Sequence, residues 1–471
     1  MPIPSLWRHA LQRPEHEAIV TGTERVTMRT LQRRVAALMN HLRERGVQPM
    51  DIVPLVLENG ADFVVALLAV LGVGARPLPI SPAWTTRERE TLLEGILAPV
   101  ALVEPTDPSG SRLASAHDVG PFVREAEPVS FAPDAEVLLP TSGSTGTPKI
   151  VRLGLAGLVW NATAHAASIG LGPEDRVFVV SPMVHAATLV AQVIAGVKRG
   201  ATLVCQRGPF MPRAFLKALE IERITATSLT PTHARMVLER GMSRGIPLGD
   251  LSRLAWVSIG AAPAEAALLK AFSDFLAECS PARLYVTYGL TEAGPRVSLL
   301  PPDRLVDRAE TVGLPLEGLT VKVEEGQLFV RTPSRMLGYL DEPPLTEEWL
   351  ATGDLASLDA EGFITLHGRI KELIVSGGIN ISPFEVEKAI LQDERIRDAA
   401  VVGIPHPVYG EVPVAYVVPA MPLAPDEVLT GLGGRLAPYK LPRQVHVLAE
   451  LPRTATGKVD KRQLREGHVG E

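Results

Sequence analysis

Short apolar runs that each end in a polar or glycine-rich loop recur between residues 137 and 290, and this recurrence constrains the fold most. The runs span residues 137–139, 177–180, 225–229, 255–259 and 284–286. Helical patterns separate most of them, for example at 155–169 and 184–197. Alternating strands and helices predict a mostly parallel sheet, and ligands of such sheets bind beyond the carboxyl ends of the strands. We therefore expect an α/β fold in which the loops after these runs converge on one site.

The first of these loops, residues 141–149, combines hydroxyl groups, glycines and a lysine. Glycines let backbone N–H groups approach an anion, hydroxyls donate hydrogen bonds to its oxygens, and lysine adds a positive charge. A flexible linker is the alternative, but the closing Pro-Lys and the flanking apolar segments favour a phosphate-binding loop. Pro148 before the lysine and Ile150 after it exclude a Walker A loop. The candidate phosphate ligands are Thr141, Ser142, Gly143, Ser144, Thr145, Gly146, Thr147 and Lys149.

A second, smaller domain is predicted to begin near Lys371. Ser382 and Glu385 have the spacing of a capping box, with proline at the first helical position, so a helix is expected to start there. Short β-rich runs at 399–402 and 414–418, a helix near 427 and a strand near 445 follow. We expect a large α/β domain over residues 1–369, with mostly parallel sheets flanked by helices, and a small α+β domain over residues 371–471.

Composition and charge exclude several classes of partner. The net charge of −6 argues against nucleic-acid binding, because no basic excess exists to neutralise phosphates along a strand. The most apolar run, residues 63–73, is too short for the roughly 20 residues that span a bilayer, so it is interpreted as a buried helix. The N-terminus lacks the long apolar core of a signal peptide. Cys205 and Cys279 are too few for a disulfide framework and fit a reducing cytoplasm, the expected location.

Three further motifs follow the loop in a fixed order. They are Tyr288-Gly289-Leu290-Thr291-Glu292-Ala293-Gly294, then Thr352-Gly353-Asp354-Leu355 with Gly368-Arg369-Ile370-Lys371-Glu372, and last Pro452-Arg453-Thr454-Ala455-Thr456-Gly457-Lys458. Together with the loop, this set resembles the adenylate-forming superfamily of acyl-CoA synthetases, nonribosomal-peptide adenylation domains and luciferases. The resemblance covers nearly the whole chain. It implies an ATP-dependent ligase that joins a small carboxylic acid to AMP and then to a thiol, most simply that of coenzyme A.

The resemblance also assigns nucleotide and metal contacts. The loop would bind the β- and γ-phosphates, and Glu292 with Thr145 would hold Mg²⁺, a hard cation that prefers oxygen ligands. Asp354 would accept the ribose hydroxyls, with a structural turn cap as the alternative, and Arg369 would reach the ribose. The remaining nucleotide contacts would be Gly260, Ala261, Ala262, Tyr288, Gly289 and Thr291. The catalytic residues would be Lys149, His185, Glu292 and Lys458.

The acid pocket is assigned by the same resemblance. His185 matches the histidine of acyl- and aryl-CoA ligases, although a lone histidine is more often structural. Amino-acid-activating members carry an aspartate in the segment that spans 181–188 here, and its absence disfavours α-amino acids as substrates. The expected pocket residues are Val184, His185, Thr188, Thr230 and Gly289. Arg296 could pair with a substrate acid or phenolate, but a surface position is slightly preferred.

In the family the small domain rotates between two half-reactions. Lys371 occupies the hinge position, Lys458 would bridge the carboxylate and the α-phosphate, and Gly378 would line the tunnel for the thiol arm. One alternative is a stand-alone enzyme that loads the phosphopantetheine of an acyl carrier protein. Another is a non-catalytic nucleotide-binding regulator, which the intact Lys149, Glu292 and Lys458 argue against.

Overall fold

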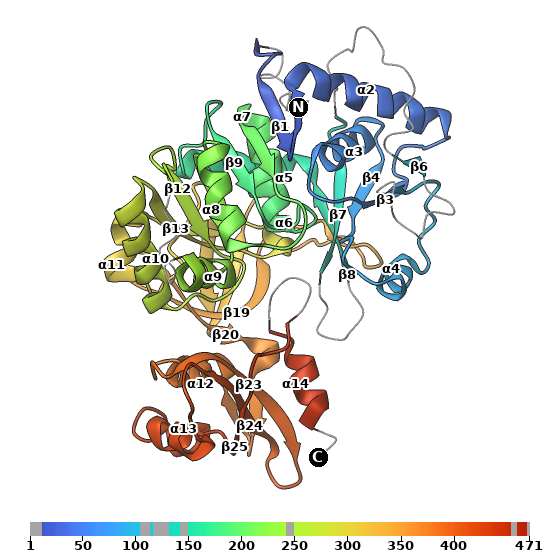
Figure 1. Ribbon diagram of the computed structural model, residues 1–471. Helices are drawn as coiled ribbons and strands as arrows, with labels where there is room; N and C mark the ends of the chain where they lie inside the picture. The colour runs from blue at the N-terminus through green and yellow to red at the C-terminus, as the bar shows by residue number, and fades with distance from the viewer. Residues whose placement is uncertain are drawn as a thin grey trace. The chain divides into compact units, whose positions relative to one another are not determined.

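The computed structural model describes residues 12–103, 114–115, 131–141, 149–241, 249–453 and 459–468, and the chain forms two compact units (Figure 1). The first unit contains residues 1–321 and 330–350, and the second contains 322–329 and 351–471. The chain therefore passes from one unit to the other three times. The predicted boundary at residues 369–371 lies inside the second unit, so the position of a rotating C-terminal domain stays a prediction.

The first unit is built around a nine-stranded sheet. In spatial order its strands are β15 (Leu314–Pro315), β14 (Ser298–Leu300), β13 (Arg283–Tyr288), β12 (Trp256–Ile259), β11 (Ala226–Leu229), β9 (Arg176–Val179), β10 (Thr202–Cys205), β1 (Glu17–Thr21) and β2 (Glu24–Thr27). The six strands from β13 to β1 pair in parallel, and antiparallel strands form both edges. The strands predicted within residues 177–286 are confirmed as β9, β11, β12 and β13, because apolar β-branched residues fill a sheet buried on both faces.

Two smaller sheets complete the first unit. One is parallel, with the order β4 (Arg76–Pro79), β3 (Ile52–Val56), β5 (Leu102–Val103) and β6 (Ala114–Ser115). The other is antiparallel, with the order β18 (Gly338–Tyr339), β8 (Lys149–Gly154) and β7 (Glu136–Thr141). The apolar run at 137–139 is therefore a strand, but its predicted place in a strand–helix alternation is wrong. β7 pairs directly with β8, so residues 141 and 149 face each other across a hairpin.

Helices separate and cover the strands of the first unit. They are α2 (Met28–Glu44), α3 (Ala61–Gly72), α4 (Thr86–Leu93), α5 (Leu155–Ser168), α6 (Ala186–Thr188), the π-helix η1 (Leu189–Ile194), α7 (Ala195–Arg199), α8 (Pro212–Ile221), α9 (Pro231–Gly241), α10 (Ala266–Cys279), η2 (Thr291–Ala293), η3 (Pro302–Arg304) and α11 (Leu305–Arg308). The predicted buried helix at 63–73 is confirmed as α3, whose side chains from Ala61 to Leu71 are all buried. The predicted helix at 184–197 is also present, but a π-turn in its middle was not predicted.

The second unit holds most of one four-stranded sheet and all of a five-stranded sheet. The first has the order β16 (Thr320–Glu324), β17 (Gln327–Arg331), β19 (Leu350–Leu358) and β20 (Ile364–Arg369). The second contains β22 (Ile379–Ile381), β21 (Ile374–Ser376), β24 (Gly410–Pro419), β23 (Ile396–His406) and β25 (Gln444–Val447). The other elements are η4 (Ile370–Glu372), α12 (Pro383–Ile390), α13 (Pro425–Leu432), η5 (Pro438–Lys440) and α14 (Lys461–His468). The predicted α+β order is thus confirmed.

Both faces of the five-stranded sheet are buried. Alternate residues of β23 and β24, such as Val401 and Val402, pack into two different apolar clusters. The helix predicted at residue 383 does begin there, as α12, but the predicted capping box is wrong. The Ser382 hydroxyl donates to the carbonyl of His367 at 2.7 Å and makes no cap hydrogen bond.

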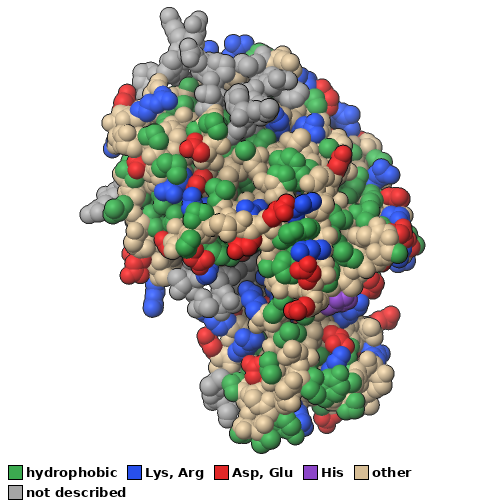
Figure 2. Space-filling view, turned by 180° about the vertical axis from the view of Figure 1, so that it is seen from behind, with side chains coloured by type: hydrophobic (Ala, Val, Ile, Leu, Met, Phe, Trp, Pro, Cys, Tyr) green, Lys and Arg blue, Asp and Glu red, His purple; other side chains and the backbone are tan. Residues whose placement is uncertain are grey.

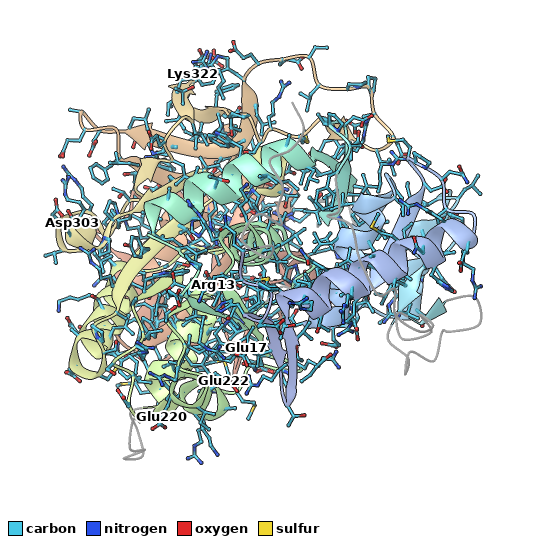
Figure 3. The ribbon with its side chains drawn as sticks, turned by 90° about the horizontal axis from the view of Figure 1, so that it is seen from above. Arg13, Glu17, Glu220, Glu222, Asp303 and Lys322 are labelled. Carbon is cyan, nitrogen blue, oxygen red and sulfur yellow. The ribbon has the colours of Figure 1, made fainter. Side chains whose placement is uncertain are left out.

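An ion-pair cluster ties the amino ends of the central strands together. Arg176, at the start of β9, pairs with Glu17 of β1 at 2.7 Å and with Glu222 at 3.0 Å. Arg25 pairs with the same Glu222 at 2.8 Å, and this contact contributes most to lowering the pKa of Glu222. Figure 3 labels Glu17 and Glu222 in this part of the sheet. Elsewhere on the surface, charges of both signs are interspersed, as Figure 2 shows for one face.

Both cysteines are free thiols. Cys205 lies in β10 and is buried, and burial raises its pKa to about 12. Cys279 ends α10 and is only partly buried, but burial raises its pKa as well. Within the described ranges, no helix has both the length and the hydropathy needed to cross a bilayer.

Candidate functional site

Loops that follow four neighbouring parallel strands hold most of the predicted pocket residues. β9, β11, β12 and β13 are adjacent in the sheet, and their carboxyl ends lead to residues 184–188, Thr230, Gly260 and Gly289 respectively. Hydrogen bonds join these ends: the Gly260 N–H donates to the Leu229 carbonyl at 3.1 Å, and the Thr287 hydroxyl donates to the Ile259 carbonyl at 3.4 Å. The predicted convergence of these segments is therefore present in the structure. They meet at the carboxyl ends of the parallel strands, which we call the sheet edge below.

Two glycines and one strained alanine fix the shape of this edge. A Cβ at Gly260 would lie 2.3 Å from the Thr287 hydroxyl, and one at Gly289 would lie 2.0 Å from the Pro295 carbonyl. Both positions therefore require glycine because of close packing. Ala261 has a φ of 69°, a left-handed conformation that is uncommon for a residue with a side chain. Such strain persists where the surroundings enforce it, often at ligand-binding segments.

A buried asparagine that sequence reasoning missed holds the segment before His185. Asn59 accepts a hydrogen bond from the Met183 N–H at 2.7 Å and donates to the Ser181 carbonyl at 3.0 Å. It also donates to the Gln206 carbonyl at 3.1 Å. His185 is half-buried at the start of α6, where its carbonyl accepts from the Leu189 N–H at 2.8 Å. The Asn-Gly pair at residues 59–60, three residues after the end of β3, indicates a turn, but it does not indicate the distant backbone groups that Asn59 binds.

The pocket residues differ in burial. Val184 and Thr188 are 7% and 5% exposed, whereas Thr230 and Gly289 are half-buried. The Thr230 hydroxyl also accepts a hydrogen bond from the His233 N–H at 3.2 Å, so it binds the first turn of helix α9. The predicted pocket thus has an uncharged lining around His185.

The ends of the predicted phosphate-binding loop are held by the β7–β8 hairpin. The Thr141 hydroxyl donates to the Lys149 carbonyl at 3.2 Å. The Lys149 ammonium pairs with Glu342 at 2.7 Å, and about half of each side chain is exposed. An ion pair this exposed contributes only about 0–1 kcal/mol, so Lys149 can exchange Glu342 for another anion. The predicted ligands from Ser142 to Thr147, including Thr145, lie outside the described residues.

Tyr339 connects Lys149 with Glu292. Its hydroxyl donates to Glu292 Oε1 at 3.4 Å, and the Lys149 ammonium lies 4.5 Å from the centre of its ring. Burial and the Glu292 carboxylate raise the pKa of Tyr339 to about 12, so the phenol remains a hydrogen-bond donor at neutral pH. Tyr339 was not predicted, but it brings the hairpin and the Tyr288 motif into one cluster.

In the second unit, the predicted ribose ligands form an ion pair. Asp354 of β19 and Arg369 of β20 are directly opposed, and Arg369 Nε lies 2.7 Å from Asp354 Oδ1. Asp354 is almost completely buried, and its N–H donates to the Thr352 hydroxyl at 3.1 Å. Lys371 is exposed in η4, just after β20.

Gly378 lies in the two-residue turn that joins β21 and β22. Both turn glycines have positive φ, 57° for Gly377 and 82° for Gly378, as a tight hairpin turn requires. A Cβ at Gly378 would meet no atom of the described residues within 4 Å, so they leave the space beside it open.

The loop that contains Lys458 lies outside the described residues, but both of its ends are described. Arg453 and Val459 form an antiparallel bridge, which closes the loop. Lys461, two residues further on, pairs with Glu387 at 2.8 Å and Glu372 at 3.1 Å. Burial lowers the pKa of Lys461, but the two carboxylates outweigh it, and the net shift is upward. These pairs attach the start of α14 to η4 and α12.

Arg296 is buried, and the slight preference for a surface position is wrong. Its side chain is 5% exposed, and burial lowers its pKa to about 10. The Asn161 amide donates to its carbonyl at 2.8 Å and to the Ser334 hydroxyl at 3.2 Å. His165, one turn after Asn161 on α5, is completely buried, and its pKa is well below normal because of burial and then the Arg296 charge. α5 therefore packs a polar face against the residues that follow the Tyr288 motif.

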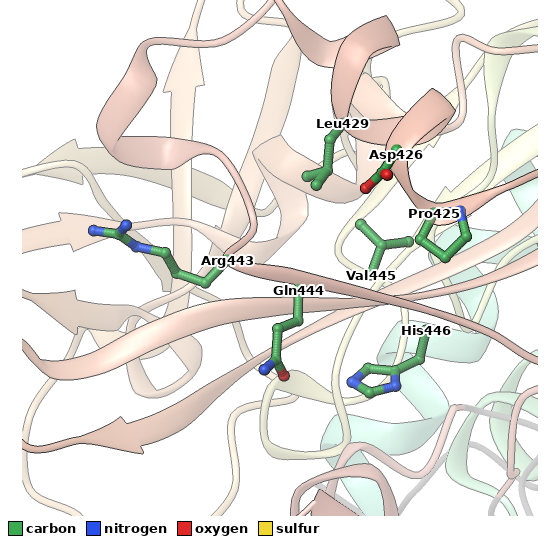
Figure 4. Close-up of a pocket in the computed structure, with 7 residues that line it drawn as sticks. All are labelled: Pro425, Asp426, Leu429, Arg443, Gln444, Val445 and His446. Atoms are coloured by element: carbon green, nitrogen blue, oxygen red, sulfur yellow. The ribbon is translucent and has the colours of Figure 1, made fainter.

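Neither a surface hollow nor a metal cluster marks a second site. A hollow of about 440 Å³ is lined by Pro425, Asp426, Leu429, Arg443, Gln444, Val445 and His446 (Figure 4), and none of the predicted site residues belongs to it. In the part of the chain that the structure describes, no group of three His, Cys, Asp or Glu side chains could hold a metal ion.

Two family models match the sequence. The one described as "AMP-binding enzyme" matches residues 6–340, and the one described as "AMP-binding enzyme C-terminal domain" matches residues 385–458. Together they include the sheet edge, the hairpin and the strands β23, β24 and β25 of the five-stranded sheet.

Relatives of known name match over nearly the whole length. A feruloyl-CoA synthase from Amycolatopsis is 32% identical over 97% of both chains, and a 2-succinylbenzoate–CoA ligase from Bacillus licheniformis is 28% identical over 96% of this chain and 97% of its own. The o-succinylbenzoate CoA synthetase of Bacillus subtilis, solved with its acyl-adenylate intermediate, superposes with a TM-score of 0.86 at 26% identity over 99% and 98% of the chains. Its complex with ATP and magnesium superposes with a TM-score of 0.85 at 27% identity over 98% and 99%.

Proposed function

The chain belongs to the AMP-binding family of adenylate-forming enzymes and is an AMP-forming acid–thiol ligase, and we propose how its own residues carry this reaction. The observation that supports the assignment best is the cluster at the sheet edge. Loops after four adjacent strands meet there, and Tyr339 joins Glu292 of the last loop to Lys149 of the hairpin. An anion-binding cation, a metal-binding carboxylate and an uncharged pocket are the parts that joining a carboxylate to a phosphate requires.

ATP is bound through its phosphates by Thr141, Lys149 and the loop between them. The exposed Lys149–Glu342 pair supports this role, because a phosphate can replace the carboxylate at little cost. Mg²⁺ fits the donors present, since Glu292 offers one half-exposed carboxylate and this cation is commonly held by one or two carboxylates together with substrate phosphates. When bound, it would neutralise phosphate charge at the leaving pyrophosphate.

We assign the rest of the nucleotide to the remaining predicted contacts. Tyr288, Thr291 and the segment 260–262 bind the adenosine part, and the strained φ of Ala261 supports a shape fixed for a ligand. Asp354 accepts the ribose hydroxyls and Arg369 reaches the ribose. Their 2.7 Å ion pair supports this role because it holds the Asp354 carboxylate in a fixed position.

The acid occupies the uncharged pocket of Val184, His185, Thr188, Thr230 and Gly289. The segment 181–188 contains no acidic side chain that could pair with a substrate ammonium group. His185 lies beside the reacting carboxylate, and Asn59 keeps its segment in position through three hydrogen bonds. We therefore assign acyl or aryl acids, and not α-amino acids, as substrates.

The second half-reaction transfers the acyl group to a thiol after the domain of residues 371–471 rotates about Lys371. Lys458 bridges the carboxylate and the α-phosphate in the first step and leaves in the second, when Gly378 lines the thiol tunnel. The open space at Gly378 supports the latter role. Coenzyme A is the acceptor, because the named relatives are CoA ligases. A carrier-protein phosphopantetheine presents the same arm and is the alternative acceptor.

The function is tested by ATP–pyrophosphate exchange and hydroxamate trapping over aliphatic, aromatic, hydroxy and α-amino acids. We expect an acyl or aryl acid to support the fastest exchange. The best acid is then assayed for thioester formation with coenzyme A and with phosphopantetheinylated carrier proteins. An α-amino acid that was preferred by a wide margin would refute the pocket assignment, and no exchange with any acid would favour a non-catalytic regulator.

A further inference from the structure

Arg296 is a buried positive charge without a described counter-ion. Only 5% of its surface is exposed, and its Nε is buried with no hydrogen-bond partner. Among the residues that the structure describes, no carboxylate forms an ion pair with it. The downward shift of its pKa has burial as its cause, with no contribution from an acidic side chain. Burying a charge without pairing it is strongly unfavourable, so such a group is expected to have an anionic partner.

The polar groups around Arg296 do not supply that partner. The low pKa of His165 makes it neutral, and both of its ring nitrogens are buried without a hydrogen bond to any described residue. Asn161 Oδ1, one turn earlier on α5, is likewise buried and unpaired. These neighbours can donate or accept single hydrogen bonds, but none carries a negative charge.

Arg296 lies directly beside the proposed nucleotide and acid contacts. A Cβ at Gly289 would lie 3.0 Å from its backbone nitrogen, and the next residue, Val297, donates to the Tyr288 carbonyl at 2.9 Å. The Arg296 N–H donates to the Gly294 carbonyl at 2.6 Å, and the Arg296 carbonyl accepts from the Asn161 amide at 2.8 Å. The backbone of Arg296 is therefore held directly beside Gly289, one of the proposed pocket residues.

We propose that Arg296 is a specificity-determining residue that binds a second anionic group of the acid substrate. The preferred substrates are then dicarboxylic acids, with one carboxylate activated by ATP and the other paired with the guanidinium. A planar guanidinium presents two parallel N–H donors to a carboxylate, which gives both charge neutralisation and direction. The remaining pocket residues carry no charge, so Arg296 alone selects for the distal group. This inference rests on the proposed ligase function.

Matched acids test the proposal on the wild-type enzyme. Succinate, glutarate, adipate and 1,4-phenylenediacetate are each compared with their monoamide in ATP–pyrophosphate exchange. The monoamide keeps the size and one reactive carboxylate but lacks the second charge. For the chain length that fits, we expect kcat/KM for the dicarboxylate to exceed that for its monoamide on the order of 100-fold, because a site that pairs a buried polar group rejects analogues that leave it unpaired.

Substitution then assigns the selectivity to the residue. Arg296→Met should bring the ratio of the two acids to within about 3-fold, mainly through a higher KM for the dicarboxylate, while exchange with the monoamide is kept or improved. Arg296→Lys should retain part of the preference for the dicarboxylate, because the positive charge remains but the two parallel N–H donors of the guanidinium are lost. Arg331→Gln, which removes an exposed arginine paired with Glu348, is the charge-matched control and should leave the ratio unchanged.

Binding gives a readout that does not depend on turnover. The dicarboxylate with AMP should raise the melting temperature of the wild type more than the monoamide with AMP does, and this difference should be absent in Arg296→Met. Wild-type enzyme that activates monocarboxylic acids as well as or better than every dicarboxylate would overturn the Arg296 proposal while leaving the ligase function intact. Failure to activate any acid would refute the ligase function, and the substrate proposal with it.

Discussion

Tyr339 shows how a single side chain can connect residues from separate motifs. Its ring lies against the Lys149 ammonium and its hydroxyl donates to the Glu292 carboxylate. Because burial and Glu292 raise its pKa to about 12, the phenol does not ionise near neutral pH and does not add a negative charge beside the proposed phosphate site. The proposed metal-binding carboxylate is thus held in position by an uncharged hydrogen-bond donor.

Replacement of Glu292 by glutamine should remove most adenylation while preserving the fold. An amide keeps the hydrogen bond from Tyr339 but lacks the charge that Mg²⁺ prefers, and the loss of about 3 kcal/mol of charge stabilisation corresponds to on the order of 100-fold in rate. Pyrophosphate exchange measured against Mg²⁺ concentration checks this, and raised Mg²⁺ should restore part of the rate. Glu342→Gln, a change of the same chemistry at the exposed partner of Lys149, should alter exchange only a few-fold. Wild-type exchange by Glu292→Gln at limiting Mg²⁺ would contradict the assignment.

Residues whose roles depend on distant partners could not be found in the sequence. Asn59 binds the backbone at residues 181, 183 and 206, more than a hundred positions away. Arg296 was expected at the surface because arginine usually is exposed, and only the packing of α5 against it shows otherwise. By contrast, Gly260 and Gly289 belong to segments that the sequence analysis singled out, and the structure shows that close packing requires glycine at both positions.

At the level of elements, apolar runs predicted the strands well but not their partners. β9, β11, β12 and β13 were predicted from local hydrophobicity, which suffices for strands buried on both faces. The sequence of β7 is as apolar as those of the other strands, yet β7 pairs with β8 across a hairpin. Local hydrophobicity indicates that a strand is buried, but it does not indicate its partner. The π-helix η1 leaves no simple pattern, since a π-turn has the composition of the α-helix around it.

The contacts of Lys461 make α14 an anchored element. Its ammonium lies between Glu387 and Glu372, which belong to α12 and η4. The loop that contains Lys458 ends three residues earlier, so these ion pairs fix one end of that loop. These ion pairs could not be predicted from the sequence, because a lysine in a charged helix is normally solvated.

Lys461→Met should destabilise the second unit by about 2–3 kcal/mol. The value lies below the roughly 3–5 kcal/mol for a fully buried pair, because 24% of the Lys461 side chain is exposed. Hydrogen exchange of the amides in β23 and β24 measures the loss within this unit. Arg462→Met, which removes an exposed pair with Glu466 on the same helix, is the matched control and should cost about 0–1 kcal/mol.

The Lys461 effect should also depend on pH in a defined direction. Lys461 lowers the pKa of Glu372 against the opposing effect of burial, so this carboxylate stabilises the fold above its ordinary pKa of about 4.3 and loses that contribution as pH falls further. The difference between wild type and Lys461→Met should therefore narrow as pH falls, first as Glu387, whose pKa burial raises, takes up a proton and then as Glu372 does. A difference that widened in acid would show that the ion pair is not its origin.

For the whole molecule, the proposed rotation about Lys371 predicts that the two half-reactions can be separated. Lys458→Ala should abolish acyl-AMP formation but leave thioester formation from supplied acyl-AMP largely intact, because its charge is needed only while two anions are joined. Gly378→Leu should do the reverse, since its side chain would occupy the proposed tunnel. Single-turnover assays of each step measure the effects separately.

Backbone strain at Gly378 requires its own control. Any side chain at a φ of 82° is strained, so Gly378→Ala carries the strain of the leucine variant without its bulk. We expect the alanine variant to keep most thioester formation. If either Lys458→Ala or Gly378→Leu slowed acyl-AMP formation and thioester formation equally in a folded protein, the rotation model would be refuted.

The burial of the two thiols makes the protein well suited to site-selective fluorescent labelling. Maleimide dyes react with the thiolate, and a pKa of about 12 leaves almost none of Cys205 in that form at neutral pH, while burial raises the pKa of Cys279 too. Cysteines introduced at exposed positions, such as Val306 in the first unit and Met421 in the second, would therefore react first. A donor–acceptor dye pair could then follow the distance between the units during turnover, in a chain that keeps both native cysteines.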